Sequence, residues 1–241
     1  TLGGDGTYHT TRTYTPPPGI TLSSTTATVR ESGVRGDMLW TKTVGDFQTE
    51  QNYLYENTVD SEMNVISAGD VWSSVAATNP VDGTQDMYIV KHGPSGELIW
   101  QRQLGAVGSD VPNDVAVDSN DNIYVFGYTL AYDGVDFSGE TISKSCGSPC
   151  SNALWLLIKY DKDGNKQWTK LSYQDGVVSD IIVEGSNLYL LGKTGGGTNT
   201  GQTTRIEKYD LNGNLLASRD LTLSWSQNPT PASIAATSSA G

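Results

Sequence analysis

Triplets of acidic and amide residues at alternate positions are the first residues in this sequence that could do chemistry. Three segments share this spacing: Asp118-x-Asn120-x-Asn122, Asp161-x-Asp163-x-Asn165 and Asp210-x-Asn212-x-Asn214. Such triplets resemble the first three ligand positions of a calcium-binding EF-hand loop. The rest of that loop is missing, because Gly164 comes fourth rather than sixth and no Glu stands twelfth. We interpret the triplets as hairpin turns and expect no cofactor. Calcium is the alternative, with Asp118, Asp161, Asp163 and Asp210 as its candidate ligands.

The chain contains few side chains that could carry out nucleophilic or acid–base catalysis. The two histidines are His9 and His92, and His92 stands where Tyr160 and Tyr209 stand in related segments. The stretch TGGGT lacks the Lys-Ser/Thr pair of a phosphate-binding loop. Asp and Glu are plentiful, but no spacing singles out a catalytic pair. We therefore assign no catalytic residue.

The two cysteines, Cys146 and Cys150, lie in the segment SCGSPCSN. Three residues separate them, whereas a redox-active CxxC pair has two. A zinc site would need two further ligands. We predict a small disulfide across the Gly-Ser-Pro turn, with two ordinary thiols as the alternative. A disulfide would place the protein in an oxidising compartment.

The composition describes an acidic chain that is rich in turn residues. Its 241 residues include 27 Asp and Glu, 15 Lys and Arg, and 27 Gly, and the net charge is −12. Such a charge repels phosphate backbones and anionic lipid, so nucleic-acid and membrane-surface partners are disfavoured. No apolar run approaches the roughly 18 residues of a membrane span, so we expect no membrane insertion.

A ten-residue pattern recurs along the chain and organises the whole sequence. It reads KHGPSGELIW from Lys91, KYDKDGNKQW from Lys159 and KYDLNGNLLA from Lys208. A basic residue thus precedes Trp100 and Trp168 by nine positions, and Ala217 takes the third tryptophan's place. In a first, weaker copy, Arg30 precedes Trp40 by ten.

Each ten-residue pattern is followed by a second one, and both have the character of β-hairpins. The second pattern reads ENTVDSEMNVISAGDV, NDVAVDSNDNIYVFGYT and SDIIVEGSNLYLLGKT in the first three units. Short runs of β-branched and aromatic residues bounded by turn residues predict strands. The turns PSG, DKDGN and DLNGN suit a hairpin with glycine in a left-handed conformation, which assigns this role to Gly96, Gly164 and Gly213.

Two hairpins per unit give four strands, and four-stranded units in series indicate a β-propeller. The predicted fold is therefore all-β, with about four four-stranded antiparallel blades, alone or as part of a larger propeller. The expected units lie near residues 29–80, 85–130, 153–194 and 203–241. We expect Trp40, Trp100 and Trp168 to fill equivalent spaces between neighbouring blades.

The second unit resembles a known family. The motifs are the Pro-Ser-Gly turn with Trp100, the stretch LGAVGSD, and AVDSNDNIYVFG. Together they resemble the bacterial seven-bladed β-propeller (SBBP) repeat, and the resemblance extends from about Thr26 to the C-terminus. It implies a propeller fold and an extracellular or cell-surface setting, but no single activity.

The turn-then-tryptophan pattern also resembles the repeat of pyrroloquinoline-quinone (PQQ) propellers, more weakly. Those enzymes hold a quinone and a calcium ion at the propeller axis, often over two adjacent cysteines. Cys146 and Cys150 are not adjacent, and no residue set here matches that pocket.

Segments outside the repeat are candidates for recognition. Residues 1–28 contain ten Thr and three consecutive prolines, which predicts an extended arm or linker. Residues 131–152 form an insertion that includes DGVDFSGE and the cysteine pair. Because propeller insertions lie on exposed loops where binding often resides, we place the candidate binding residues here. They are Asp133, Asp136 and Glu140.

These features favour a non-enzymatic structural or adhesion module at the cell surface, outside the cell or on a virion. Its expected partners are a protein or glycan bound through propeller loops, and neighbouring subunits of an assembly. The alternative is a propeller enzyme of quinone-dependent or glycan-processing type that uses carboxylates on the propeller axis.

The fourth unit stops at ASIAATSSAG, without the strand that NIYVFG provides in the second unit. A strand from the Thr/Tyr-rich segment GDGTYHTTRTYT could complete this blade. The preferred alternative is that further blades follow or that neighbouring subunits complete the arc.

Overall fold

The structure is a computed structural model that describes most of the repeat region. The described residues are 8–10, 29–31, 52–72, 85–131, 136–137, 139–142, 153–172, 176–194, 203–221 and 233–235. Among the residues named above, Trp40, Asp133, Cys146 and Cys150 lie outside this set, so their predicted roles stay predictions.

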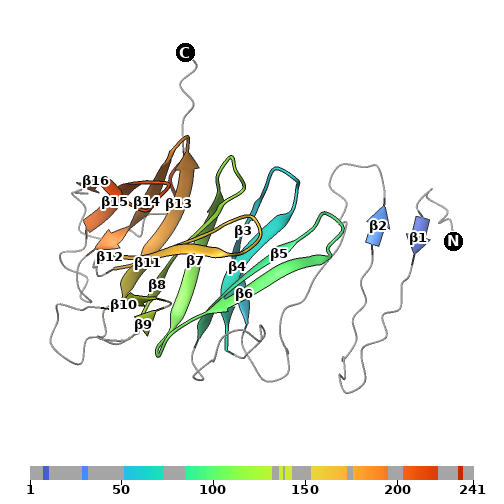
Figure 1. Cartoon of the computed structure of the whole chain (residues 1–241), viewed down its shortest axis with the longest axis horizontal. Helices are drawn as coiled ribbons and strands as arrows, with labels where there is room; N and C mark the ends of the chain where they lie inside the picture. Colours follow the sequence, from blue (N-terminus) through green and yellow to red (C-terminus); the bar gives the residue numbers. More distant parts are fainter. Residues whose placement is uncertain are drawn as a thin grey trace, which may run out of the picture.

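The described chain is all-β, which confirms the predicted fold class. Three four-stranded antiparallel sheets lie side by side (Figure 1). Blade 1 contains β3 (Tyr53–Val59), β4 (Val65–Val71), β5 (Asp86–His92) and β6 (Leu98–Leu104). Blade 2 contains β7 (Asp110–Val117), β8 (Ile123–Thr129), β11 (Leu154–Tyr160) and β12 (Lys166–Ser172). Blade 3 contains β13 (Val178–Glu184), β14 (Asn187–Thr194), β15 (Thr203–Asp210) and β16 (Leu215–Leu221). No helix in this part of the chain is long and apolar enough to cross a membrane.

The first strands of the three sheets converge. β7 packs against β3 and β4 on one side and against β13 on the other. The first strand of each sheet therefore lies at the inner edge, and the chain runs outward through each sheet in sequence order. Radial sheets of four antiparallel strands are the blades of a β-propeller.

The sheets are out of step with the units expected from the sequence. Each sheet joins the second hairpin of one unit to the ten-residue pattern of the next, as where β4 pairs with β5 and β8 pairs with β11. The described residues thus form three complete blades, and the predicted bounds near 85–130 and 153–194 divide blades rather than enclose them.

The second strand of each blade has a glycine near its end, and a bulge in the inner strand explains why. The register shifts between Leu54 and Glu56, between Pro112 and Asp114, and between Val178 and Asp180. Gly69, Gly127 and Gly192 face these bulges. A Cβ at Gly192 would lie 2.6 Å from the Val177 carbonyl oxygen, and one at Gly69 or Gly127 would overlap a backbone oxygen. Only glycine allows this approach.

The core lies between the blades rather than within one. Blade 2 is apolar on both faces because successive side chains of a strand point to opposite sides. In β8, Ile123 and Val125 face blade 1, whereas Tyr124 and Phe126 face blade 3. All four side chains are fully buried. The unbroken apolar runs IYVF and LWLLI in β8 and β11 follow from this double burial.

Two short pairs lie outside the blades. β9 (Asp136–Phe137) and β10 (Glu140–Thr141) form a hairpin inside the predicted insertion. β1 (Tyr8–Thr10) pairs with β2 (Val29–Glu31), at the opposite end of Figure 1 from β16. In the structure the pairing partner of this N-terminal segment is the start of the first unit.

Candidate functional site

The turn of one blade is held by a lysine and a tryptophan of the blade before it. Lys91 Nζ and Trp100 Nε1 both donate to the Lys162 carbonyl oxygen, each at 3.1 Å. Arg102 Nε donates to the Gly164 carbonyl oxygen at 2.7 Å. We call the lysine-to-carbonyl bond the turn contact. It joins blade 1 to the hairpin turn between β11 and β12 of blade 2.

The same turn contact recurs between blades 2 and 3. Lys159 Nζ donates to the Leu211 carbonyl oxygen at 3.0 Å and lies 5.2 Å from the Tyr124 ring centroid. Lys162 and Leu211 are the second residues of the DKDG and DLNG turns. The cation–π contact and the carbonyl together fix the ammonium group.

The nine-residue spacing in the sequence is a cross-strand pair. Lys91 pairs with Trp100, Lys159 with Trp168, and Lys208 with Ala217, each across a bulge that follows the lysine. Directly paired side chains share one face of the sheet, which places lysine and tryptophan together against the next blade. Trp100 is 7% exposed, whereas Trp168 is partly buried.

The three predicted turn glycines have left-handed backbones. Their φ angles are 80° at Gly96, 76° at Gly164 and 79° at Gly213. Gly164 and Gly213 also lie against the preceding blade. A Cβ at Gly164 would lie 2.7 Å from Trp100 Cδ2, and one at Gly213 would lie 3.3 Å from Trp168 Cη2. The turns thus need glycine for two separate reasons.

Three of the four aspartates proposed as calcium ligands, Asp118, Asp161 and Asp210, have their oxygens engaged in their own turns. Asp161 accepts the backbone N–H groups of Asp163 and Asn165 at 3.0 and 2.8 Å, and the Asn165 side chain at 3.0 Å. Asp118 and Asp210 accept the matching bonds. In the described residues, no three His, Cys, Asp or Glu side chains are arranged to hold a metal ion.

These turn bonds also favour the ionised aspartates. Burial opposes ionisation of Asp161, but the bonds from Asn165 and Asp163 outweigh it and lower its pKa. The pKa of Asp118 is lowered in the same way. At Asp210 the bonds from Asn214 are the largest cause of a lowered pKa.

Blade 1 adds a buried ion pair to this scheme. Lys91 Nζ lies 2.7 Å from Asp60 Oδ2, and both side chains are almost fully buried. Burial alone would raise the pKa of Asp60, but the bonds from Lys91 and Asn64 lower it below the usual value. Lys91 therefore joins the inner turn of blade 1 to the outer turn of blade 2.

Two carboxyl groups meet at the inner edges of blades 2 and 3. Asp114 and Asp180 each follow the bulge of their inner strand, and Asp114 hydrogen-bonds Asp180. Asp114 also accepts the backbone N–H of Ile181 at 2.8 Å and of Val115 at 2.7 Å. Burial and the contact with Asp180 raise the pKa of Asp114 to about 7. Asp114 therefore keeps its proton to a higher pH than an exposed aspartate does.

This carboxyl pair does not have the geometry of a glycosidase. Retaining and inverting enzymes hold their two carboxyl groups about 5–9.5 Å apart, with the sugar or a water between them. Asp114 and Asp180 are hydrogen-bonded to each other, and each also accepts a backbone N–H from the chain that follows. Their arrangement stabilises the junction between inner strands.

The predicted insertion contributes a surface hairpin. Phe137 and Ile142 are fully buried in the core between blades 1 and 2, and they anchor β9 and β10. Asp136 and Glu140 are exposed on the same hairpin, and Gly139 N–H donates to Asp136 at 3.1 Å. Lys166 of the neighbouring β12 lies within electrostatic range of both carboxylates. The hairpin is an acidic projection anchored by two buried side chains.

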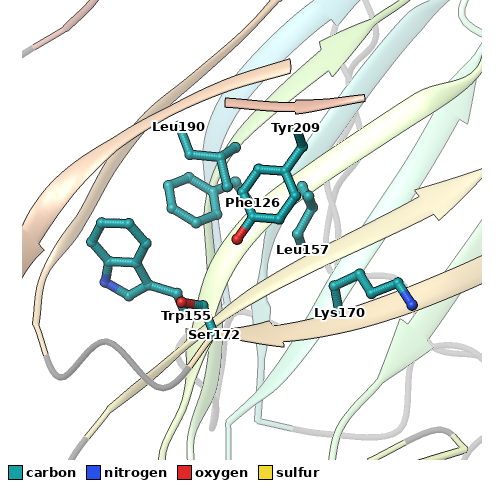
Figure 2. A pocket seen from close by; sticks show the side chains of 7 residues that line it. All are labelled: Phe126, Trp155, Leu157, Lys170, Ser172, Leu190 and Tyr209. Carbon is teal, nitrogen blue, oxygen red and sulfur yellow. The ribbon is translucent and has the colours of Figure 1, made fainter. Parts of the chain in front are cut away.

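A narrow crevice separates blades 2 and 3 (Figure 2). Its lining residues are Phe126, Trp155, Leu157, Lys170, Ser172, Leu190 and Tyr209. The Tyr209 hydroxyl donates to Glu207 at 2.7 Å rather than to the space. The cavity measures about 10 Å³, which is room for about one water molecule. It is a packing gap between blades and too small for an organic ligand.

Comparison with known proteins agrees with this architecture. Residues 99–134 match a family described as "Beta-propeller repeat", SBBP. The matched segment runs from β6 through β8, across the junction of blades 1 and 2. The chain is a β-propeller protein.

A curated relative of this propeller comes from Acanthamoeba polyphaga mimivirus. It is described as an uncharacterized WD repeat-containing protein and is 32% identical over 107 residues. The match covers 44% of this propeller chain but only 8% of the viral protein.

Sequence reasoning located the turns but not their partners. It missed the lysine contacts and the Asp114–Asp180 pair, because single charged residues usually mark solvated surface. One signal was present: Asn-Asp precedes VAVD and Ser-Asp precedes IIVE at matching places in two units.

Proposed function

We propose that this propeller is a non-catalytic binding module of an extracellular, cell-surface or virion protein, and that it binds a protein partner through its surface hairpins. One observation carries the proposal. The polar residues of the repeat motif are engaged in turns and interblade bonds, whereas Asp136 and Glu140 are presented to solvent on an anchored hairpin. An anchored hairpin loses little conformational entropy on binding.

The charge of the chain supports a partner with a basic contact surface. The net charge is −12, and the hairpin presents two exposed carboxylates near the exposed Lys166. Opposite charge on a partner would speed association and fix its orientation. The curated relative comes from a virus, so a virion stays among the three proposed locations.

Peptide and glycan arrays test this proposal. The purified chain is applied to an array of Lys/Arg-containing peptides and to a glycan array. We expect salt-sensitive binding to a subset of basic peptides, and loss of that binding in the double variant Asp136→Lys, Glu140→Lys. Glu184→Lys, an exposed acid on blade 3, is the matched control. Binding that is indifferent to the double variant, or confined to glycans, contradicts the proposal.

The contact between Asp114 and Asp180 motivates a test of the alternative, a carboxylate-based enzyme. A hydrolysis screen against oligosaccharides, with Asp180→Asn as the comparison, decides it. Because the carboxyl groups are hydrogen-bonded to each other, we expect no turnover that depends on Asp180.

A further inference from the structure

The face of blade 3 that points away from blade 2 is uncovered, unlike the same face of the other two blades. Six of the seven residues of β16 are exposed, whereas β6 and β12 are covered at most positions beyond their first two. Ala217 of blade 3 is exposed, whereas Trp100 at the equivalent position of blade 1 is buried. The outer strand of blade 3 is therefore exposed to solvent where the next blade covers its counterparts in blades 1 and 2.

The uncovered face repeats the arrangement that makes a turn contact in the other blades. Lys208 Nζ lies 5.5 Å from the Tyr189 ring centroid, just as Lys159 Nζ lies 5.2 Å from Tyr124. Lys159 donates to a carbonyl oxygen of the next blade. In the described part of the chain, Lys208 has no such acceptor. Its ammonium group is thus held in position by the same cation–π contact.

The chain beyond β16 returns to the inner edge in the register of a new blade. Ile234 N–H donates to Asp180 Oδ2 at 2.6 Å, and Ile181 N–H donates to Asp114 Oδ2 at 2.8 Å. Asp114 and Asp180 occupy the same position in their blades. Ile234 therefore corresponds to Ile181, and residues 233–235 follow the course of an inner strand.

We propose that the uncovered face of β15 and β16 is a docking face for the hairpin turn of a further repeat, carried by a blade whose inner strand begins at residues 233–235. Lys208 donates to the carbonyl oxygen of the turn's second residue, as Lys91 and Lys159 do. The turn glycine lies over Ala217, and Arg219 takes the place of Arg102.

A grafted blade tests the proposal through the reactivity of Lys208. Residues 1–234 are followed by a copy of residues 182–221, in which the second copy of Lys208 is changed to arginine so that mass spectrometry reports on the original Lys208 alone. We expect acetylation of Lys208 to slow by at least about tenfold, as buried amines do, while exposed Lys162 reacts unchanged. A graft joined after Ala235 is the matched control, because a one-residue shift turns every side chain to the other face.

A second arm uses the unextended chain, so that a graft that fails to fold does not decide the result. A cyclised hairpin peptide with the sequence of residues 155–172 is added at millimolar concentration, and protection of Lys208 is measured. Protection of Lys208 in either arm, with no protection by the graft joined after Ala235, supports the proposal. Unchanged acetylation in both arms overturns it. Protection that rises with the concentration of the unextended chain, together with a dimer, identifies a second copy as the occupant and also overturns it.

Discussion

The indole ring of Trp100 contacts two blades at once, so its removal tests the packing between them. It belongs to blade 1, stacks on Tyr160 of blade 2 at 6.3 Å between ring centroids, and donates to the Lys162 carbonyl oxygen. We expect Trp100→Ala to lower the free energy of unfolding by about 3–5 kcal/mol, measured by denaturant melts.

Trp168 and Leu98 supply the comparison for that measurement. Trp168 is only partly buried at the equivalent position, so Trp168→Ala should cost less than Trp100→Ala. Leu98 is 52% exposed on the same strand as Trp100, and Leu98→Ala should change stability by no more than about 0.5 kcal/mol. Equal costs for all three variants would contradict interblade packing by Trp100.

Two left-handed glycines separate backbone strain from steric contact. Gly164 and Gly185 have φ angles of 76° and 58°, but only Gly164 faces another residue where a Cβ would be. Gly185→Ala should therefore cost only the backbone term, on the order of 1 kcal/mol. Gly164→Ala should cost clearly more, because its methyl group would lie 2.7 Å from Trp100.

Thermal melts of the two glycine variants, and of each combined with Trp100→Ala, measure the difference. The excess cost of Gly164→Ala should shrink when Trp100 is removed, because the two residues are in contact. The cost of Gly185→Ala should not change. If Gly164→Ala still costs more stability than Gly185→Ala when Trp100 is absent, the strain lies in the turn itself.

The pair formed by Asp114 and Asp180 makes the junction of β7 and β13 sensitive to pH. The pKa of Asp114 is raised from 3.8 to about 7, first by burial and then by Asp180. A raised folded-state pKa adds stability at low pH that is lost as the pH rises through about 4 to 7. The stability difference between the parent chain and Asp114→Asn should therefore be larger at about pH 5 than at about pH 8.

Urea melts at the two pH values test this sign. Using the difference between two proteins cancels the turn aspartates, whose lowered pKa values give the opposite slope. Asp136→Asn, which replaces an exposed carboxylate on the surface hairpin, is the control variant. A difference for Asp114→Asn that grows with pH would contradict a raised pKa of Asp114.

At the scale of secondary-structure elements, the sequence predicts the hairpins but not the sheets that they build. The turn DKDGN is a local signal, because its Asp161 and Asn165 bond to each other and its Gly164 needs a left-handed backbone. The pairing of β4 with β5 joins segments separated by residues 72–85, a connection much longer than a hairpin loop of about two to five residues. The blade boundaries follow from that non-local pairing.

Across the whole molecule, the blades form a series in which each contacts its neighbours. Stability in such arrays is approximately a sum of blade terms and interface terms. The interface of blades 1 and 2 has Lys91, Trp100 and Arg102 donating across it, whereas that of blades 2 and 3 has Lys159 and the Asp114 bond to Ile181. The bond from Ile234 N–H to Asp180 extends the same logic to residues 233–235.

Matched truncations test that last point. A chain ending at residue 235 keeps the bond from Ile234 N–H to Asp180, and a chain ending at residue 232 loses it. A hydrogen bond to a charged group contributes on the order of 1.5–3 kcal/mol, so the shorter chain should melt roughly 3–10 °C lower. Hydrogen exchange should also quicken in β13, which carries Asp180, and remain unchanged in β3 of blade 1. Equal melting temperatures for the two truncated chains would show that residues 233–235 do not act as the first strand of a further blade.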